Sequence, residues 1–207
     1  YWNTGSRRKP SYAEGLRLTL TDRSPLVAGV DPSTPVTDFT VLQGNRAVAA
    51  AGDFDQDGQT DLVVGDATSG VTYFRNAGTT REPAFAPGII LAKLSGRVHL
   101  AAADMSGDRV PDLVVAMSGA GAEEQVQVVE TKLTAQGPQW TFPGRYLPLT
   151  SWIPYPQPSV LDVNGDGDMD VVLSSSYSVI YWVEGSTQQQ IAQPIVIGYE
   201  RLGHTRF

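Results

Sequence analysis

The sequence has no cysteine and only two histidines among its 207 residues. Without cysteine, disulfide bonds and thiolate metal sites are excluded. His99 and His204 are too few for a zinc site, and they leave little material for a nucleophilic catalytic triad. We read His99 as a packed or edge residue of a strand and place His204 in a C-terminal tail. We therefore expect the chain not to be an enzyme.

Long apolar runs and helical periodicity are also missing. No run approaches the roughly 18 apolar residues of a membrane-spanning helix, so we expect no membrane span. No stretch of about eleven residues repeats its apolar positions at helical spacing, so we expect almost no helix. The net charge of -7 argues against a nucleic-acid partner, because such partners bind basic surfaces.

Aspartate is concentrated in three stretches that share one nine-residue pattern. We call them the first loop (residues 53–61, DFDQDGQTD), the middle loop (residues 104–112, DMSGDRVPD) and the third loop (residues 162–170, DVNGDGDMD). Each loop begins and ends with aspartate and runs directly into three apolar residues. Together they hold half of the 22 acidic residues, so the acidity indicates metal sites rather than an acidic surface.

Alternating acidic side chains in a tight loop can converge on one hard cation. Ca²⁺ takes six to eight oxygen ligands, and Gly58 at the sixth position suits the sharp turn that such a cage requires. An EF-hand would need glutamate at position twelve, where the loops have Val64, Val115 and Leu173. That alternative fails. Mg²⁺ suits a cage of several protein carboxylates less well than the larger, more flexible Ca²⁺.

Short strand-like segments between the loops group in fours, which predicts an all-β chain. The architecture we expect is a β-propeller of four-stranded blades. We expect trailing strands of a preceding blade at 1–20, a connector at 21–44, and three blades at 45–96, 97–155 and 156–207. The chain would begin inside a repeat, because residues 1–12 (YWNTGSRRKPSY) align with residues 74–85 (FRNAGTTREPAF).

Several predicted strands decide how the blades are counted. They include residues 16–20, 84–91, 140–142 and 194–199. The segment 194–199 would be the fourth strand of the last blade, so the N-terminal strands are not needed to complete that blade. We therefore expect an open arc of about three blades and a trailing half blade. Its end faces would be covered by further blades, from missing sequence or from another chain.

Residues 49–78 (AAAGDFDQDGQTDLVVGDATSGVTYFRNAG) resemble the FG-GAP/VCBS repeat of integrin α-chain propellers and of many secreted or surface proteins, and residues 161–173 do so as well. The resemblance covers nearly the whole chain except residues 21–44. It implies that each repeat is one blade with Ca²⁺ in the hairpin between its first two strands. It also implies a ring of seven blades and an extracellular or cell-surface location.

The resemblance assigns metal ligands in the flanking loops. They are Asp53, Asp55, Asp57, the Gln59 carbonyl and Asp61 in the first loop, and Asp162, Asn164, Asp166, the Asp168 carbonyl and Asp170 in the third. The middle loop has Ser106 in place of a carboxylate and Arg109 in place of glycine. A cation beside the cage opposes Ca²⁺. The middle set, expected to be weaker, is Asp104, Ser106, Asp108 and Asp112. Alternatively, Arg109 lies across the three aspartates and replaces the metal.

Aromatic residues are the candidates for partner binding. Five occupy equivalent strand positions and are expected mostly in the core between blades: Trp2, Tyr73, Phe74, Tyr181 and Trp182. Trp140, Trp152 and Tyr155 either stack on a sugar or partner side chain or cap the seam between blades. Two functions remain open: a calcium-stabilised binding or structural module for a protein or glycan, and an accessory propeller of a secreted polysaccharide-acting enzyme whose catalytic domain lies outside this chain.

Overall fold

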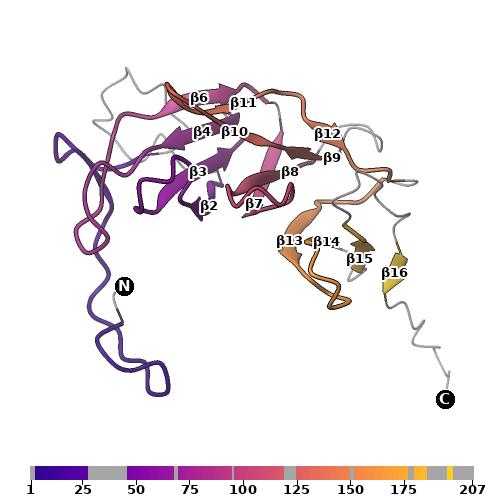
Figure 1. Cartoon of the computed structure of the whole chain (residues 1–207), viewed down its shortest axis with the longest axis horizontal. Helices are drawn as coiled ribbons and strands as arrows, with labels where there is room; N and C mark the ends of the chain where they lie inside the picture. The colour runs from indigo at the N-terminus through magenta and orange to yellow at the C-terminus, as the bar shows by residue number, and fades with distance from the viewer. Residues whose placement is uncertain are drawn as a thin grey trace, which may run out of the picture.

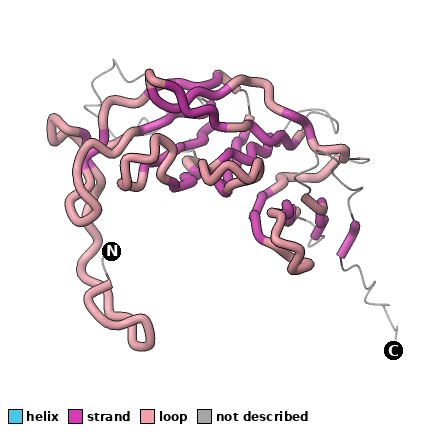
Figure 2. Tube along the Cα trace, in the orientation of Figure 1, coloured by secondary structure: helices cyan, strands magenta, loops and turns pink. Residues whose placement is uncertain are grey.

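The computed structural model describes residues 3–27, 46–67, 70–94, 96–118, 125–149, 152–176, 180–185 and 195–197. Their regular structure is entirely β-strand (Figure 2). Within these ranges no helix has the length and apolar character needed to cross a membrane. The predictions on Trp2, His204 and most of the connector at 21–44 fall outside the described residues. The all-β prediction is confirmed.

The strands form three antiparallel four-stranded sheets, one around each acidic loop. The first sheet contains β2 (Val48–Gly52), β3 (Asp61–Asp66), β4 (Gly70–Phe74) and β6 (Ile89–Ala92). The middle sheet contains β7 (Arg97–Ala103), β8 (Asp112–Ser118), β9 (Val126–Val129) and β12 (Arg145–Tyr146). The third sheet contains β13 (Gln157–Leu161), β14 (Asp170–Ser174), β15 (Ile180–Val183) and β16 (Ile195–Ile197). In each sheet the strands are adjacent in the order of the chain.

Each acidic loop joins the first two strands of its sheet at the same register. The ninth-position aspartate opens the second strand and pairs with the residue that closes the first: Gly52 with Asp61, Ala103 with Asp112, and Leu161 with Asp170. The apolar triplet that follows the aspartate then runs along the second strand. The three loops are therefore the same hairpin built three times, as their common spacing predicts.

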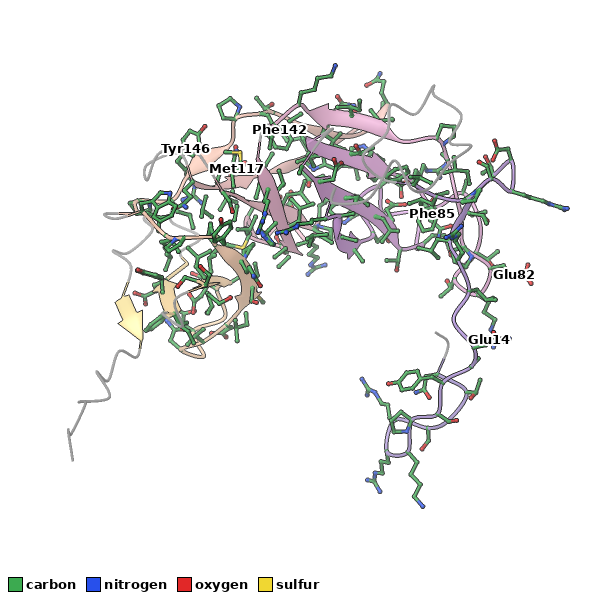
Figure 3. The ribbon with its side chains drawn as sticks, turned by 180° about the vertical axis from the view of Figure 1, so that it is seen from behind. Glu14, Glu82, Phe85, Met117, Phe142 and Tyr146 are labelled. Carbon is green, nitrogen blue, oxygen red and sulfur yellow. The ribbon has the colours of Figure 1, made fainter. Side chains whose placement is uncertain are left out.

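The sheets stand side by side in an arc (Figure 1). Strand β7 contacts β2 and β3 of the first sheet and β13 of the third sheet. Because successive side chains of a strand point to opposite faces, β8 packs in both directions. Leu113, Val115 and Met117 belong to the core shared with the first sheet, and Val114 and Ala116 to the core shared with the third. Met117 and Phe142 lie close together in Figure 3, in the first of these cores.

The N-terminal segment reaches the outer face of the first sheet at β1. Strand β1 (Thr19–Leu20) pairs in parallel with β5 (Ala84–Phe85). Leu20 and Leu26 pack there against Val64 and Phe74 of the first sheet and against Phe85 of β5. Before β1 the chain hangs away from the sheets, with Glu14 far from any of them (Figure 3).

Residues 3–12 and 76–85 form the same loop, as their alignment predicts. The Asn3 side chain accepts the N–H groups of Gly5 (3.0 Å) and Ser11 (3.1 Å). Asn76 does the same for Gly78 (3.0 Å) and Ala84 (3.2 Å). Glycine is required two residues after the asparagine, because a Cβ there would lie 2.3–2.4 Å from a backbone carbonyl oxygen.

Three predicted strands differ from the structure. The predicted strand 84–91 is two strands, β5 and β6, separated by residues 86–88; at Gly88 a Cβ would lie 2.7 Å from the Phe74 ring. The predicted strand 16–20 is only β1. The prediction of 140–142 as the middle sheet's fourth strand is wrong, since that place is taken by β12. Trp140 instead ends β11 (Gly137–Trp140), which forms a separate hairpin with β10 (Thr131–Thr134).

Among the described residues the sheets do not close into a ring. The N-terminal strand β1 pairs with β5 beside the first sheet, and the partner of β16 is β15 within the third sheet. The first and third sheets therefore lie at opposite ends of the arc (Figure 1).

Candidate metal centre

The first-position aspartate braces each loop from inside. Its Oδ2 accepts the N–H of the sixth-position residue in all three copies: Gly58 to Asp53 at 3.0 Å, Arg109 to Asp104 at 2.8 Å and Gly167 to Asp162 at 3.0 Å. The fifth-position aspartate accepts the N–H two residues on in each loop, at 2.8–2.9 Å. These bonds close the turn around the carboxylates.

Left-handed backbone occurs at two positions of every loop. At the sixth position φ is 86° at Gly58, 71° at Arg109 and 93° at Gly167, as the turn was predicted to require. The fourth position is also left-handed, with φ of 58° at Gln56 and 80° at both Gly107 and Gly165. A side chain at positive φ is strained. The first loop therefore carries strain at its fourth position and the middle loop at its sixth.

The ninth-position aspartate ties the loop to the end of the third strand. Asp61, Asp112 and Asp170 are fully buried. Each accepts the N–H of the residue that follows the third strand by two positions, donated by Asn76 at 2.7 Å, Thr131 at 2.8 Å and Gly185 at 2.7 Å. Their other oxygens accept the Tyr73 hydroxyl (2.8 Å), the Met105 N–H (2.9 Å) and the Val163 N–H (2.9 Å), respectively.

Burial is the largest influence on the pKa values of Asp61, Asp112 and Tyr73. Burial raises the pKa of Asp61 and of Asp112 above the ordinary range, although their hydrogen bonds act in the opposite direction. Burial, followed by the hydrogen bond to Asp61, raises the pKa of Tyr73. The ninth aspartate is therefore a structural brace whatever else it binds.

Only one loop, within the part of the chain that the structure describes, gathers its carboxylates into a group. Asp53, Asp55 and Asp61 each offer an oxygen, and these atoms all lie within 4.8 Å of one another. The Oδ1 atom of Asp53 is buried and has no hydrogen-bond partner among the described residues. Several carboxylate oxygens around a point fit a hard cation such as Ca²⁺.

Two further predicted ligands lie beside this group. Asp57, at the fifth position, accepts a hydrogen bond from the Arg75 guanidinium through its Oδ2 atom. The side-chain oxygen of Gln59 accepts a hydrogen bond from the Thr80 hydroxyl at 3.0 Å. A metal-binding role for Gln59 would therefore fall to its backbone carbonyl, as the sequence predicts.

The middle and third loops have the same backbone hydrogen bonds as the first loop, but they differ from it in how their carboxylates lie. Among the described residues, the carboxylates of the middle loop (Asp104, Asp108, Asp112) and of the third loop (Asp162, Asp166, Asp168, Asp170) do not come together in this way. In the third loop, Asn164 donates to Asp166 at 2.8 Å and to Glu184 at 3.1 Å. In the middle loop, the Ser106 side chain lowers the pKa of Asp112, against the larger effect of burial. The metal-binding roles of these residues stay predictions.

The cation that lies on an acidic loop is not the one expected from the sequence. Within the described residues Arg109 forms no ion pair with the middle-loop aspartates, so the alternative in which it replaces the metal is wrong. Arg75 instead lies on the first loop, with Nε 2.5 Å from Asp55 Oδ2 and Nη2 2.6 Å from Asp57 Oδ2. These hydrogen bonds raise the pKa of Arg75, so its charge is permanent. Sequence reasoning missed it, although it directly follows the aromatic strand end at Phe74.

The aromatic residues divide between the seam and the surface. The Trp140 ring lies 5.0 Å from the Tyr73 ring and 5.9 Å from that of Phe54, and its N–H donates to Thr131 at 2.8 Å. Trp140 thus caps the seam between the first and middle sheets. Trp152 and Tyr155 are 51% and 41% exposed, and the Arg97 guanidinium lies 4.7 Å above the Tyr155 ring.

Comparison with known families places one repeat on this frame. Residues 53–115 match the model of the FG-GAP-like repeat. The match begins at the first residue of the first loop and ends in β8, so it covers the first and middle loops and the strands β3 to β7 between them. The predicted FG-GAP resemblance is confirmed over these residues. No curated protein matches the chain.

Proposed function

Because the chain carries an FG-GAP-like repeat over residues 53–115, we propose that it is part of a calcium-stabilised β-propeller. In this proposal each four-stranded sheet is a blade, and the acidic loops hold Ca²⁺. The assembled propeller is an extracellular, non-enzymatic module that binds a protein or a glycan.

The observation that carries the calcium proposal is the oxygen group of the first loop. Asp53, Asp55 and Asp61 converge, and Asp53 Oδ1 is buried without a partner in the described part of the chain. An unsatisfied buried carboxylate oxygen is costly. A bound Ca²⁺ would satisfy this oxygen and would offset the repulsion between the three carboxylates.

Direct titration tests this proposal. Calorimetric titration of the chelator-treated chain with CaCl₂ should show binding that Asp53→Asn weakens by at least about tenfold, since one charged ligand is lost. Glu82→Gln is the matched control, because Glu82 is an exposed acidic residue of the segment between β4 and β5, outside the acidic loop. Absence of binding heat, with a folded protein verified by circular dichroism, would refute the proposal.

The register of the third sheet supports a larger propeller. In the first sheet the cross-strand pair Val63 and Tyr73 faces the middle sheet, and in the middle sheet the pair Val114 and Val128 faces the third. The equivalent pair of the third sheet is Val172 and Trp182. Its face also carries Leu161 and Ile180, which are 45% and 40% exposed. A further sheet, packed as in the first two interfaces, would cover this face, in line with a ring of seven blades.

The binding role rests on the surface aromatics rather than on the acidic pairs. Trp152 and Tyr155 present rings to solvent that suit stacking on a sugar or on a partner's side chain. The three buried aspartates already have structural roles, since both oxygens of Asp61, Asp112 and Asp170 accept hydrogen bonds within the fold. We therefore assign no catalytic residue to the chain.

A further inference from the structure

In each sheet one residue directly follows the third strand, next to the N–H group that binds the ninth-position aspartate. The ninth-position aspartate accepts an N–H from Asn76, Thr131 or Gly185, which are therefore structurally equivalent. The residues immediately before them are also equivalent: Arg75 in the first sheet, Glu130 in the middle sheet and Glu184 in the third. This position thus holds a cation in the first sheet and an acid in the other two.

Arg75 and Glu184 contact the same place in their loops. Arg75 pairs with Asp55, the third-position residue, and with Asp57. Glu184 accepts a hydrogen bond from Asn164, which is the third-position residue of the third loop. The first loop, rich in carboxylates, thus receives a guanidinium. The third loop, which has an uncharged amide at that position, receives an additional carboxylate.

The contact of Arg75 uses oxygens that the first loop would offer to a metal. Both bonded atoms are Oδ2 oxygens, one of Asp55 and one of Asp57, and both distances are those of strong charge-assisted hydrogen bonds. The guanidinium and a divalent cation therefore compete for the same negative charge. The partly exposed guanidinium is free to swing into solvent when the metal binds, because its side chain is 49% exposed.

We propose that the residue at this position sets the calcium affinity of its loop: Arg75 is a built-in competitor that weakens Ca²⁺ binding in the first loop, and Glu184 strengthens it in the third. This inference rests on the proposed calcium binding. Arg75 also stabilises the calcium-free first loop, because it neutralises carboxylates that otherwise repel each other. Calcium binding to this loop is then an exchange of one cation for another and depends on salt.

The test measures each loop separately in the full chain. In an Asp162→Asn background, which disables the third loop, calorimetric titration with CaCl₂ reads the first loop. Arg75→Gln should raise its affinity about fivefold, the size expected for loss of a partly exposed ion pair, and Arg75→Glu should raise it further. Arg81→Gln is the matched control, because Arg81 is an exposed arginine of the segment between β4 and β5, outside the acidic loop.

The converse exchange is made in the third loop. In an Asp53→Asn background, Glu184→Arg should lower the remaining calcium affinity about fivefold or more, while Glu82→Arg should leave it unchanged. Without Ca²⁺, the Arg75→Gln variant should also melt at a lower temperature than the Arg81→Gln variant, because Arg75 stabilises the calcium-free first loop.

Two results would overturn the inference, and they are distinguishable. If the backgrounds bind Ca²⁺ but Arg75→Gln and Glu184→Arg match their controls, the position does not set affinity and the proposed function stands. If no variant and no background binds Ca²⁺ while all remain folded, the inference and the proposed function fail together.

Discussion

The first and middle loops share one backbone frame but use their first aspartate differently. Asp53 Oδ2 accepts a hydrogen bond from the Gly58 N–H, whereas Asp53 Oδ1 is buried without a partner among the described residues. Asp104 accepts the N–H groups of residues 107–109 with both oxygens. The middle loop therefore satisfies its own carboxylate, whereas the first loop has an oxygen left over for a ligand.

The two loops also carry their strain and their cations in different places. The middle loop holds Arg109 at φ 71° where the first loop has Gly58, and its guanidinium contacts no loop aspartate among the described residues. The first loop receives its cation from Arg75, outside the loop. The first and ninth aspartates thus build the same hairpin in both loops, and the loops differ at the remaining positions.

The largest loss of stability is expected on substitution of the ninth-position aspartate, which the two loops share. Asp112→Ala removes a fully buried acceptor and leaves the N–H groups of Met105 and Thr131 without a partner. We expect the free energy of unfolding to fall by about 3 kcal/mol, because each unsatisfied buried group costs about 1–3 kcal/mol. Urea denaturation measures it. Asp108→Ala, at an exposed position of the same loop, is the control.

Asp61→Ala should destabilise the chain as much as Asp112→Ala, because Asp61 braces the first loop in the same way. A loss below about 0.5 kcal/mol for either variant, within the range of ordinary surface substitutions, would mean that the ninth aspartate is not a brace. A large loss in only one of them would show that the two hairpins are not equivalent.

Substitutions in the first and middle loops should differ in their effect on stabilisation by Ca²⁺. A ligand that binds only the folded state stabilises it by about 2.7 kcal/mol at a hundredfold excess over its dissociation constant. For a chain of this length we expect melting to rise by about 5–10 °C between chelator and Ca²⁺. Asp57→Ala in the first loop should remove most of the part of this rise that the first loop supplies, and Asp108→Ala in the middle loop should leave the rise intact. Equal rises in both variants would place the metal elsewhere.

The hairpins were predictable because their information is local. Aspartate at positions one and nine, a turn residue between them and an apolar triplet after them lie within about twelve consecutive residues. Alternating strand pairing then follows from short segments and their spacing. The same holds for the loop at Asn3 and Asn76, whose side-chain bonds stay within ten residues.

What sequence reasoning missed depends on contacts between distant segments. Arg75 meets Asp55 only because β3 and β4 pair in a register that brings the end of β4 over the loop. Trp140 leaves the predicted strand because its ring fills the seam beside Phe54 and Tyr73, which lie more than sixty residues earlier. The oxygen left over on Asp53 likewise depends on which backbone groups reach it, and the aspartate pattern does not specify them.

A smaller effect is expected from the strained position of the middle loop. Arg109→Gly removes a side chain from positive φ and should stabilise the chain by about 0.5 kcal/mol, since strain relief of about 1 kcal/mol is partly offset by the added freedom of the unfolded glycine. It should also raise the calcium affinity of the middle loop or the number of bound Ca²⁺. Gln56→Gly in the first loop is the control for the backbone term. A middle loop that already binds Ca²⁺ as tightly as the first would contradict this prediction.

The smallest effect concerns pH and the strand that leads into the middle loop. His99 lies five residues before Asp104, where the first sheet has Val48 five residues before Asp53, and both pair with the residue four after the ninth aspartate. Burial, and secondarily the charge of Arg97, lowers the pKa of His99 below its ordinary value. The folded chain then binds fewer protons than the unfolded chain between that lowered pKa and about pH 6.5, so stability falls as pH drops through this window.

The substitution His99→Val gives the middle sheet the residue of the first and should flatten this dependence. Urea denaturation between about pH 7.5 and pH 5.5 measures it, and the difference between variant and parent reports His99 alone. Asp61 and Asp112 titrate with the opposite sign, because burial raises their pKa and the folded chain gains protons there as the pH falls. Both chains retain these aspartates, so their contribution cancels in the difference. Parallel curves for the two chains would mean that His99 keeps its ordinary pKa in the folded state, and that the two strands do not differ in their response to pH.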